Sequence, residues 1–258
     1  MKINLKQVEA FVRRSFLPIG SRIPVPLTNG LGAGHRAYGA LSYSNIFKKD
    51  DAEDIYLKSL PLSGKTVCDI GGFIGITAIF FSSRVGDKGH VYCFEPNPDL
   101  VQMIRKNRRL NKLHWLDIIN AGIGEKEGTL TLTVDRDHAA TGTLRKVHAH
   151  GDVRSVTVPV HTLDDLHAAK KITPPSFVKI DTEGYELYVL RGMKDIIKEH
   201  SPELFIEVHG TDDTAAMYTF LFHHGYRIFH VEHNTEIRGT PHPWARFGHI
   251  HCTLKRRR

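Results

Sequence analysis

The sequence predicts an α/β protein in which a mostly parallel sheet carries helices on both faces. Residues 66–97 run from an apolar strand through a glycine-rich turn and a helix to a second apolar strand that ends in an acid. This is the order of parts in a βαβ unit. Beyond this unit, short β-branched runs keep alternating with helical segments. The chain has 258 residues, of which 41% are hydrophobic, and this fits one large domain with a small extension.

Seven strands are expected in the sheet. Their apolar runs lie at 67–70, 90–94, 117–120, 177–180, 204–208, 227–231 and 250–254. The last two are expected to pair antiparallel. Helices are expected between the strands, at 74–84, 99–110, 186–193 and 213–223. Asp99 is the expected N-cap of the second of these helices.

A β-hairpin is expected as an insert after the third strand. Residues 128–134 and 153–160 alternate with a period of two, which is typical of antiparallel strands with one solvated face. The insert covers about residues 126–160 and includes a connecting loop at 135–152.

The first 60 residues form an expected N-terminal extension, and residues 61–258 form the main domain. Residues 6–16 suit a short amphipathic helix, and residues 50–60 suit a second one. Residues 18–39 are rich in Pro and Gly without a clear period, which indicates a loop or short strands. We expect this extension to form a cap over a bound ligand.

The turn after the first strand indicates which ligand it binds. Gly71 and Gly75 have no Cβ, so the backbone can turn sharply and approach a ligand closely. A nicotinamide cofactor would place its pyrophosphate on the helix N-terminus, but Asp69 precedes the first glycine and would repel it. The acid suits a cationic amino group, as in S-adenosylmethionine. A tight turn without any ligand is the alternative. Glu95 disfavours it, because a carboxylate at the end of the second strand can accept hydrogen bonds from both hydroxyls of a ribose.

Polar side chains gather where the predicted strands end. In open α/β sheets, ligands bind beyond the carboxyl ends of the strands. These positions hold Asp69, Glu95, Asp181, Glu207 and His209. Because burying an unpaired carboxylate costs several kcal/mol, packing explains these residues poorly, and a binding or catalytic site is expected at this edge.

With these motifs, the chain resembles the FkbM-type S-adenosylmethionine-dependent methyltransferase family. The matching segments follow the family's order over about residues 66–210 and are Val67–Thr77, Phe94–Pro98, Asn107 with Asn111, Ala121–Gly124, Thr162–Leu166, Val178–Glu186 and Phe205–His209. The run Lys-Ile-Asp-Thr-Glu-Gly-Tyr-Glu at 179–186, taken with the rest, is specific. The resemblance implies a Rossmann-like class I methyltransferase fold and methyl transfer to an oxygen of a small molecule, such as a polyketide or sugar hydroxyl.

The resemblance and the residue chemistry together imply which residues bind the cofactor. They are Asp69, Gly71 and Gly75 at the methionine end, Glu95 at the ribose, Gly122 and Ile123 at the adenine, and Asp181 at the next strand end. The family usually carries Asn where this chain has Phe73 in the turn. Phe cannot donate the hydrogen bonds of an amide, and it would instead stack or close the pocket.

Three residues are the candidate catalytic groups: Asp181, Glu183 and His209. Methyl transfer requires in-line alignment at the sulfonium methyl carbon, and a hydroxyl acceptor must also lose its proton to a base. His209 is the natural base near neutral pH, and the alternative is a structural histidine held by Glu207. Asp181, Glu207 and His209 also suit a divalent metal, but the base is favoured and no metal ligand is assigned. Glu186 is expected to complement a helix dipole.

Other functions compete with this one. A net charge of +7 and the basic tail at 255–258 would suit a nucleic-acid methyltransferase, although no aromatic-rich basic platform supports that alternative. Phe73 motivates a non-catalytic S-adenosylmethionine-binding module, and Asp69 disfavours a nicotinamide oxidoreductase. We expect a small-molecule acceptor rather than a nucleic-acid partner.

The compartment is expected to be cytoplasmic. No apolar run approaches the ~20 residues that span a bilayer, so no membrane contact is expected, and the N-terminus lacks an apolar signal-peptide core. Cys68, Cys93 and Cys252 lie in apolar runs without CxxC spacing. They are expected to be buried thiols.

Overall fold

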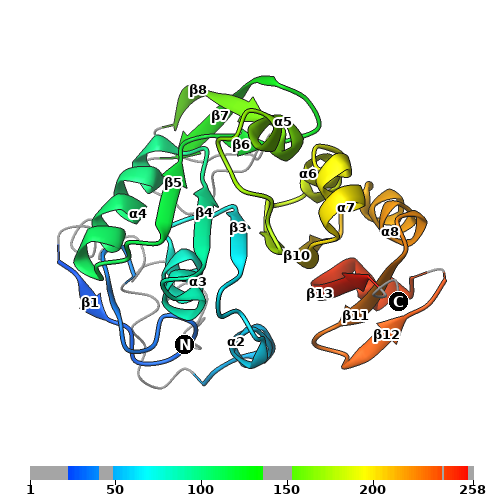
Figure 1. Ribbon diagram of the computed structural model, residues 1–258, viewed down its shortest axis with the longest axis horizontal. Coiled ribbons are helices and arrows are strands. Elements are labelled where there is room, and N and C mark those ends of the chain that lie inside the picture. The colour runs from blue at the N-terminus through cyan, green and yellow to red at the C-terminus, as the bar shows by residue number, and fades with distance from the viewer. Residues whose placement is uncertain (1–22, 41–48, 136–152, 240, 255–258) are drawn as a thin grey trace, which may run out of the picture.

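The computed structural model describes residues 23–40, 49–135, 153–239 and 241–254. Its main sheet has eight strands in the order β12-β11-β13-β10-β9-β3-β4-β5 (Figure 1). The strands are β3 (Thr66–Ile70), β4 (His90–Phe94), β5 (Leu116–Ile119), β9 (Phe177–Ile180), β10 (Glu203–His209), β11 (Tyr226–His230), β12 (Thr235–Ile237) and β13 (Phe247–Leu254). The expected α/β, Rossmann-like class I fold is confirmed.

The sheet is mixed and mostly parallel. The five neighbouring strands from β10 to β5 are parallel. The last strand in the sequence, β13, lies between β10 and β11 and is antiparallel to both. This confirms the predicted antiparallel pair, and all seven expected strands are present. The extra edge strand, β12, was missed because three residues are too few for a period-two pattern.

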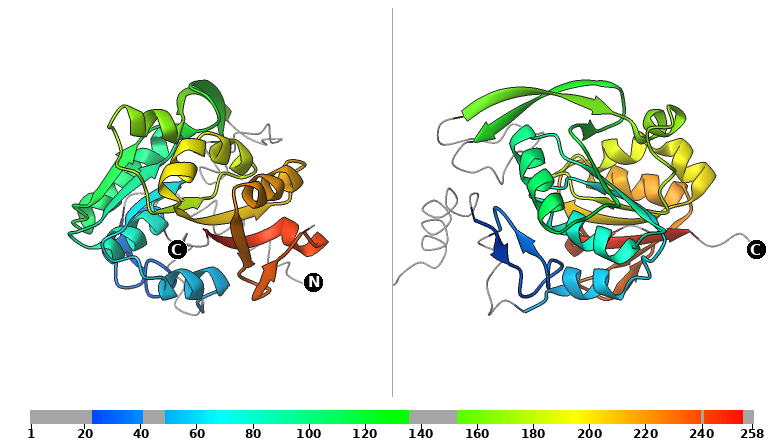
Figure 2. Two further views of the ribbon diagram at one scale, coloured as in Figure 1. Left: turned by 45° about the vertical axis from the view of Figure 1, so that its right-hand side comes forward. Right: turned by 60° about the vertical axis from the view of Figure 1, so that its left-hand side comes forward.

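Helices cover both faces of the sheet (Figure 2). They are α2 (Ala52–Ser59), α3 (Ile76–Val85), α4 (Pro98–Leu110), α5 (Leu163–Ala168), α6 (Glu186–Arg191), α7 (Lys194–His200), α8 (Thr214–His223) and the short 3₁₀ helix η3 (Pro243–Arg246). Side chains alternate along each strand and so divide the core in two. On β3, Val67 packs in the core formed with α2, α3 and α4, whereas Cys68 and Ile70 pack in the core formed with α5 to α8.

Three predicted helix boundaries were wrong. The helix expected to begin at Ile74 begins at Ile76, after the N-cap Gly75. The N-cap of α4 is Asn97, whose side chain accepts the Asp99 N–H, with Pro98 in the first turn. The helix expected at 186–193 ends earlier, at Arg191. Gly192 follows, where a Cβ would lie 1.9 Å from the Gly124 carbonyl oxygen. The chain then starts the unpredicted helix α7.

The predicted insert forms a separate three-stranded sheet in the order β6-β8-β7. Its strands are β6 (Gly122–Ile123), β7 (Gly128–Asp135) and β8 (Val153–His161). The antiparallel pairing of β7 with β8 confirms the predicted hairpin. The parallel pairing of β6 with β8 was not predicted. Beyond Asp135, the expected loop lies outside the described residues.

The described part of the N-terminal extension shares a core with the main domain. Its two short strands, β1 (Val25–Pro26) and β2 (Arg36–Ala37), pair antiparallel. Leu27, Leu31 and Leu57 are buried in the same cluster as α3 and α4. The helix expected at 6–16 and the basic tail lie outside the described residues.

Two asparagines, Asn107 in α4 and Asn111 at its C-cap, bind this extension to the domain. The side-chain oxygen of Asn107 accepts the Tyr38 N–H at 2.7 Å, and its amide donates to the Ile74 carbonyl at 2.8 Å. Asn111 likewise accepts the Arg36 N–H at 3.0 Å and donates to the Arg36 carbonyl at 2.7 Å. Asn107 therefore links the extension to the glycine turn, which gives a physical reason for this asparagine pair.

The three cysteines are buried and free, as expected. Within the part of the chain that the structure describes, no helix combines the length and apolar character that crossing a bilayer requires.

Candidate functional site

The glycine turn between β3 and α3 is fixed by backbone contacts. The Gly71 and Gly72 N–H groups both donate to the Phe94 carbonyl, at 3.0 and 3.1 Å. Gly71 and Gly75 have φ values of +89° and +88°, which residues with a side chain rarely adopt. A Cβ on Gly71 would lie 1.8 Å from the backbone oxygen of Asp181. The turn therefore joins the ends of β3, β4 and β9, and this contact requires glycine.

Glu95 ties this turn to the start of α4. Its carboxylate accepts the Phe73 N–H at 2.9 Å and the Asn97 N–H at 2.8 Å. Glu95 is 6% exposed, and burial raises its pKa to about 7 although both hydrogen bonds act in the opposite direction. Phe73 makes this contact through its backbone, so the departure from Asn leaves it intact. The assignment of Glu95 to the ribose stays a prediction.

Asp69 and Lys179 form a buried charged pair on one face of the sheet. They are register partners on β3 and β9, and they are 0% and 2% exposed. Thr77 donates to Asp69 Oδ2 at 2.8 Å, whereas Oδ1 has no hydrogen-bond partner among the described residues. Burial raises the pKa of Asp69, and the Lys179 ammonium opposes that rise. Lys179 donates to Asp181 Oδ2 at 3.0 Å and so holds that carboxylate at the end of β9.

The predicted catalytic residues meet at the ends of β9 and β10. His209 Nε2 lies 3.5 Å from Glu183 Oε2, 3.6 Å from Glu207 Oε1 and 3.7 Å from Asp181 Oδ1. Adjacent parallel strands end at the same edge of a sheet, which is why residues so far apart in the sequence converge here. The structure thus brings Asp181, Glu183 and His209 together with Glu207, which was also expected at this edge.

Glu186 orients the ring of His209. Its Oε1 accepts from His209 Nδ1 at 3.0 Å and from the Gly184 N–H at 2.7 Å, and the residue is 4% exposed. Burial would lower the pKa of His209, but the hydrogen bond to Glu186 and the surrounding carboxylates raise it to about 9. These surroundings favour the protonated form of His209, and its role as the catalytic base stays a prediction.

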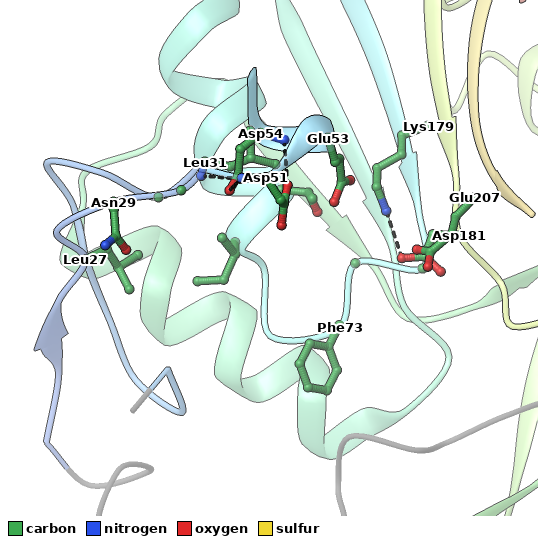
Figure 3. Close-up of a pocket in the computed structure, with 16 residues that line it drawn as sticks. Leu27, Asn29, Leu31, Asp51, Glu53, Asp54, Phe73, Lys179, Asp181 and Glu207 are labelled. Carbon is green, nitrogen blue, oxygen red and sulfur yellow. Dashed lines mark hydrogen bonds and ion pairs between the residues drawn. The ribbon is translucent and has the colours of Figure 1, made fainter. Parts of the chain in front are cut away.

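A pocket of about 210 Å³ lies between the turn and these strand ends (Figure 3). Gly71 and Phe73 line it from the glycine turn, and Glu53 lines it from α2. Lys179 comes from β9, Asp181 follows the end of β9, and Glu207 comes from β10. The labelled side chains of Glu53, Lys179, Asp181 and Glu207 lie close together on one side of it, and Phe73 lies on another (Figure 3). This arrangement can accept hydrogen bonds, take up a proton or hold a cation.

The N-terminal extension supplies one wall of this pocket. Asp51 and Asp54 form a capping box at the start of α2, and Asp54 also accepts the Leu31 N–H at 3.0 Å. These bonds fix α2 so that Glu53 lines the pocket, 3.6 Å from His249 Nε2. Burial raises the pKa of Glu53. Sequence reasoning missed Glu53, and the acidic run at 50–54 was the available signal.

The predicted cofactor residues occupy different positions relative to the pocket. Gly71 and Asp181 line it, whereas Asp69, Gly75 and Glu95 lie in or beside the turn without lining it. Gly122 and Ile123 form β6, and Ile123 is buried in the core on the side of α5 to α8. Neither residue lines the pocket, and their contact with adenine stays a prediction.

Lys179 begins the run at 179–186, but no role was predicted for it. The available signal was a lysine inside a four-residue strand whose other members are Phe, Val and Ile, because such a strand is buried on both faces in a parallel sheet. A lysine there requires buried acidic partners. The structure supplies them in Asp69 and Asp181.

Comparison with known proteins gives two curated relatives. Hexuronic acid methyltransferase AglP of Haloferax volcanii is 30% identical over 145 residues, which cover 56% of this chain and 56% of that protein. Methyltransferase 1 of Beauveria bassiana is 24% identical over 152 residues, which cover 50% of this chain and 58% of that protein. The chain thus spans little more than half the length of these relatives.

Among solved structures, a methyltransferase FkbM from Methylobacillus flagellatus is 21% identical, with a TM-score of 0.48, and the match covers 85% of this chain and 48% of that one. Fibrillarin from Aeropyrum pernix, solved with S-adenosyl-L-methionine, is 12% identical, with a TM-score of 0.45. That match covers 76% of this chain and 69% of the fibrillarin chain. The Methyltransferase FkbM domain itself matches residues 69–228, a span that contains the glycine turn, the buried pair and the cluster around His209. This chain therefore belongs to the FkbM methyltransferase domain family.

Proposed function

We propose that this chain transfers a methyl group from S-adenosylmethionine to a hydroxyl oxygen of a small molecule or sugar. The observation that carries the proposal is a single pocket in which the glycine turn meets Asp181 and Glu207. The turn suits the cofactor, and the carboxylates suit an acceptor that donates hydrogen bonds and must lose a proton. The family membership supports the use of S-adenosylmethionine. The name of the Haloferax relative, a hexuronic acid methyltransferase, supports a sugar-like acceptor.

Asp69 supports the choice of cofactor. Its Oδ1 is buried and lacks a hydrogen-bond partner among the described residues, and an unpaired buried oxygen of this kind is costly. The ammonium group of the cofactor's methionine end would supply the missing donor. A pyrophosphate would instead add negative charge beside a carboxylate.

S-adenosylmethionine and its demethylated product should therefore bind, and NAD should not. Calorimetric titration of the purified, cofactor-stripped protein measures all three ligands. A screen of neutral, amino and uronic sugars with labelled cofactor then tests transfer to the acceptor. Tight NAD binding without an S-adenosylmethionine signal would contradict the proposal.

Cofactor affinity should also depend on the ionisation of Glu95. The ionised carboxylate is the form that accepts both ribose hydroxyls, and burial raises its pKa to about 7. Affinity should therefore fall about tenfold as the pH drops from 8 to 6, because the ionised fraction falls by that factor. At pH 8, Glu95→Gln should weaken binding by about 1.5–3 kcal/mol and remove this part of the pH dependence.

The amino group of the cofactor also titrates, but it affects the parent and Glu95→Gln equally. The difference in pH dependence between the two proteins therefore reports Glu95 alone. Calorimetry of S-adenosylhomocysteine binding at several pH values makes the comparison. Equal affinity and equal pH dependence in the two proteins would mean that Glu95 only holds the turn.

A further inference from the structure

One ring nitrogen of His209 faces three carboxylate oxygens across a gap. The separations from Nε2 to Glu183, Glu207 and Asp181 are 3.5, 3.6 and 3.7 Å. Charge-assisted hydrogen bonds between nitrogen and oxygen are shorter, at roughly 2.7–3.2 Å. One ligand atom each from Asp181, Glu207 and His209 also lies within 4.8 Å of the other two. The three carboxylates thus lie at ion-pair distances from His209 Nε2, beyond the usual length of a hydrogen bond.

The gap has a size that a metal ion fills. Two ligand atoms about 2.1 Å from one ion lie roughly 3.0 Å apart at octahedral angles and 3.4 Å apart at tetrahedral angles. The observed separations of 3.5–3.7 Å exceed the tetrahedral value by about 0.1–0.3 Å and the octahedral value by about 0.5–0.7 Å. Small rotations of the carboxylates would close the difference.

The partners of these groups leave the converging atoms free. Lys179 donates to Asp181 Oδ2, and it is Oδ1 that faces His209. Glu186 accepts from His209 Nδ1, so the lone pair of Nε2 can point into the gap when Nδ1 carries the proton. A carboxylate behind a ligating imidazole is the usual orienting partner at metal sites.

A separate feature, outside this cluster, is a further buried carboxylate on the same face of the sheet. Asp69 is fully buried one strand away, and its Oδ1 has no partner among the described residues. Its charge acts on Asp181 and Lys179. Lys179 is thus shared between two carboxylates of this face, and Glu207 adds a third at the pocket.

We propose that the ends of β9 and β10 bind one hard divalent cation, Mn²⁺ or Mg²⁺, through Asp181, Glu207 and His209, with Glu183 completing the protein ligands. Three carboxylates with one imidazole favour this class of ion over the softer transition metals. Asp181 and Glu207 also line the pocket, so the ion would contact the acceptor there. The inference deepens the proposed function and rests on it only for the role of the ion.

That role is to make the acceptor hydroxyl easier to deprotonate. The proton would pass to a pocket carboxylate or to water. The acceptor oxygen would then bond to the methyl carbon as the carbon–sulfur bond breaks, which leaves methylated product and S-adenosylhomocysteine. The ion is not consumed, and no oxidant or reductant is needed.

Calorimetric titration of the full chain with Mn²⁺, after removal of metals by EDTA and without cofactor or acceptor, tests the proposal. We expect one Mn²⁺ per chain, and loss of the electron paramagnetic resonance signal of free Mn²⁺ reports the same event. Glu207→Gln and His209→Gln should each weaken binding at least tenfold. Glu186→Gln, which changes only the orienting partner, should weaken it by about 10–100-fold. The matched control is Glu236→Gln in β12, a carboxylate paired with Arg227 and Arg238, and it should bind Mn²⁺ as the parent does.

Absence of Mn²⁺ and Mg²⁺ binding at millimolar concentration would overturn the proposal. So would binding that both Glu207→Gln and His209→Gln leave unchanged. If circular dichroism shows that the His209 variant is unfolded, Glu183→Gln carries the test, because its side chain is 58% exposed and the fold should tolerate the change. The measurement contains no cofactor and no acceptor, so its outcome is independent of the S-adenosylmethionine titration that tests the proposed function.

Discussion

Gly71→Ala should abolish cofactor binding and lower the free energy of unfolding by about 3 kcal/mol or more. A residue with a side chain pays ~1–2 kcal/mol for a left-handed backbone, and φ at Gly71 is +89°. The added Cβ would also lie 1.8 Å from the Asp181 carbonyl oxygen. Because that atom belongs to the backbone, the turn and the end of β9 would have to separate. Overpacking of this kind typically costs a further ~1–3 kcal/mol.

Two other glycines separate these contributions. Gly64 has φ of +73° and open space around its Cβ position, so Gly64→Ala should show the backbone cost alone, about 1–2 kcal/mol. Gly128 has open space and no positive φ, and Gly128→Ala should stay within about 0.5 kcal/mol of the parent. Urea denaturation and titration with S-adenosylhomocysteine measure both effects. If Gly71→Ala costs no more than Gly64→Ala, the contact with Asp181 does not constrain the turn.

The sequence predicted long or doubly buried elements well. The expected strands at 90–94 and 177–180 coincide with β4 and β9, because each is an apolar run bounded by polar or turn residues. Short elements were missed because they contain too few residues to show a pattern. Helices α5 and α7 have six and seven residues, too few for a helical period to stand out, and β6 is a two-residue strand that pairs with β8 through its backbone.

The strand-end rule placed most of the site, because it depends only on where the strands stop. It located Asp181, Glu183 and His209 at one edge of the sheet. It could not give the orientation of His209, which depends on the buried Glu186 in the first turn of α6. It also could not find Glu53, since α2 reaches the pocket only through the packing of the N-terminal extension.

Glu186 has a second role in addition to the predicted one at the start of a helix. Its place in the first turn of α6 suits the helix dipole. The structure adds that the same carboxylate accepts from His209 and from the Gly184 N–H. These bonds hold the loop after β9 against the end of β10, so Glu186 positions the cluster in addition to its place in the helix.

His209→Ala should lower the rate of methyl transfer by about 10²–10⁴-fold, the range for loss of a group that assists proton removal. Cofactor affinity should change by less than about threefold, because the expected cofactor contacts lie at the glycine turn and Glu95. His209 instead stands among Asp181, Glu183 and Glu207. Single-turnover rates and calorimetry with S-adenosylhomocysteine separate the two quantities. The matched control is His200→Ala, which lies just before the start of β10 and should leave both unchanged.

The same variant separates a base from a metal ligand. If the cluster acts only as a base, EDTA should leave the parent enzyme active. If it binds a cation, EDTA should remove the activity, Mn²⁺ should restore it, and His209→Ala should require far more Mn²⁺ than the parent. We expect the second pattern, because the gap between His209 Nε2 and the carboxylates is too wide for hydrogen bonds and close to the spacing of metal ligands. Normal turnover by His209→Ala on a genuine acceptor would place catalysis away from these strand ends, and Glu53, which lines the pocket from α2, would then be the next carboxylate to replace.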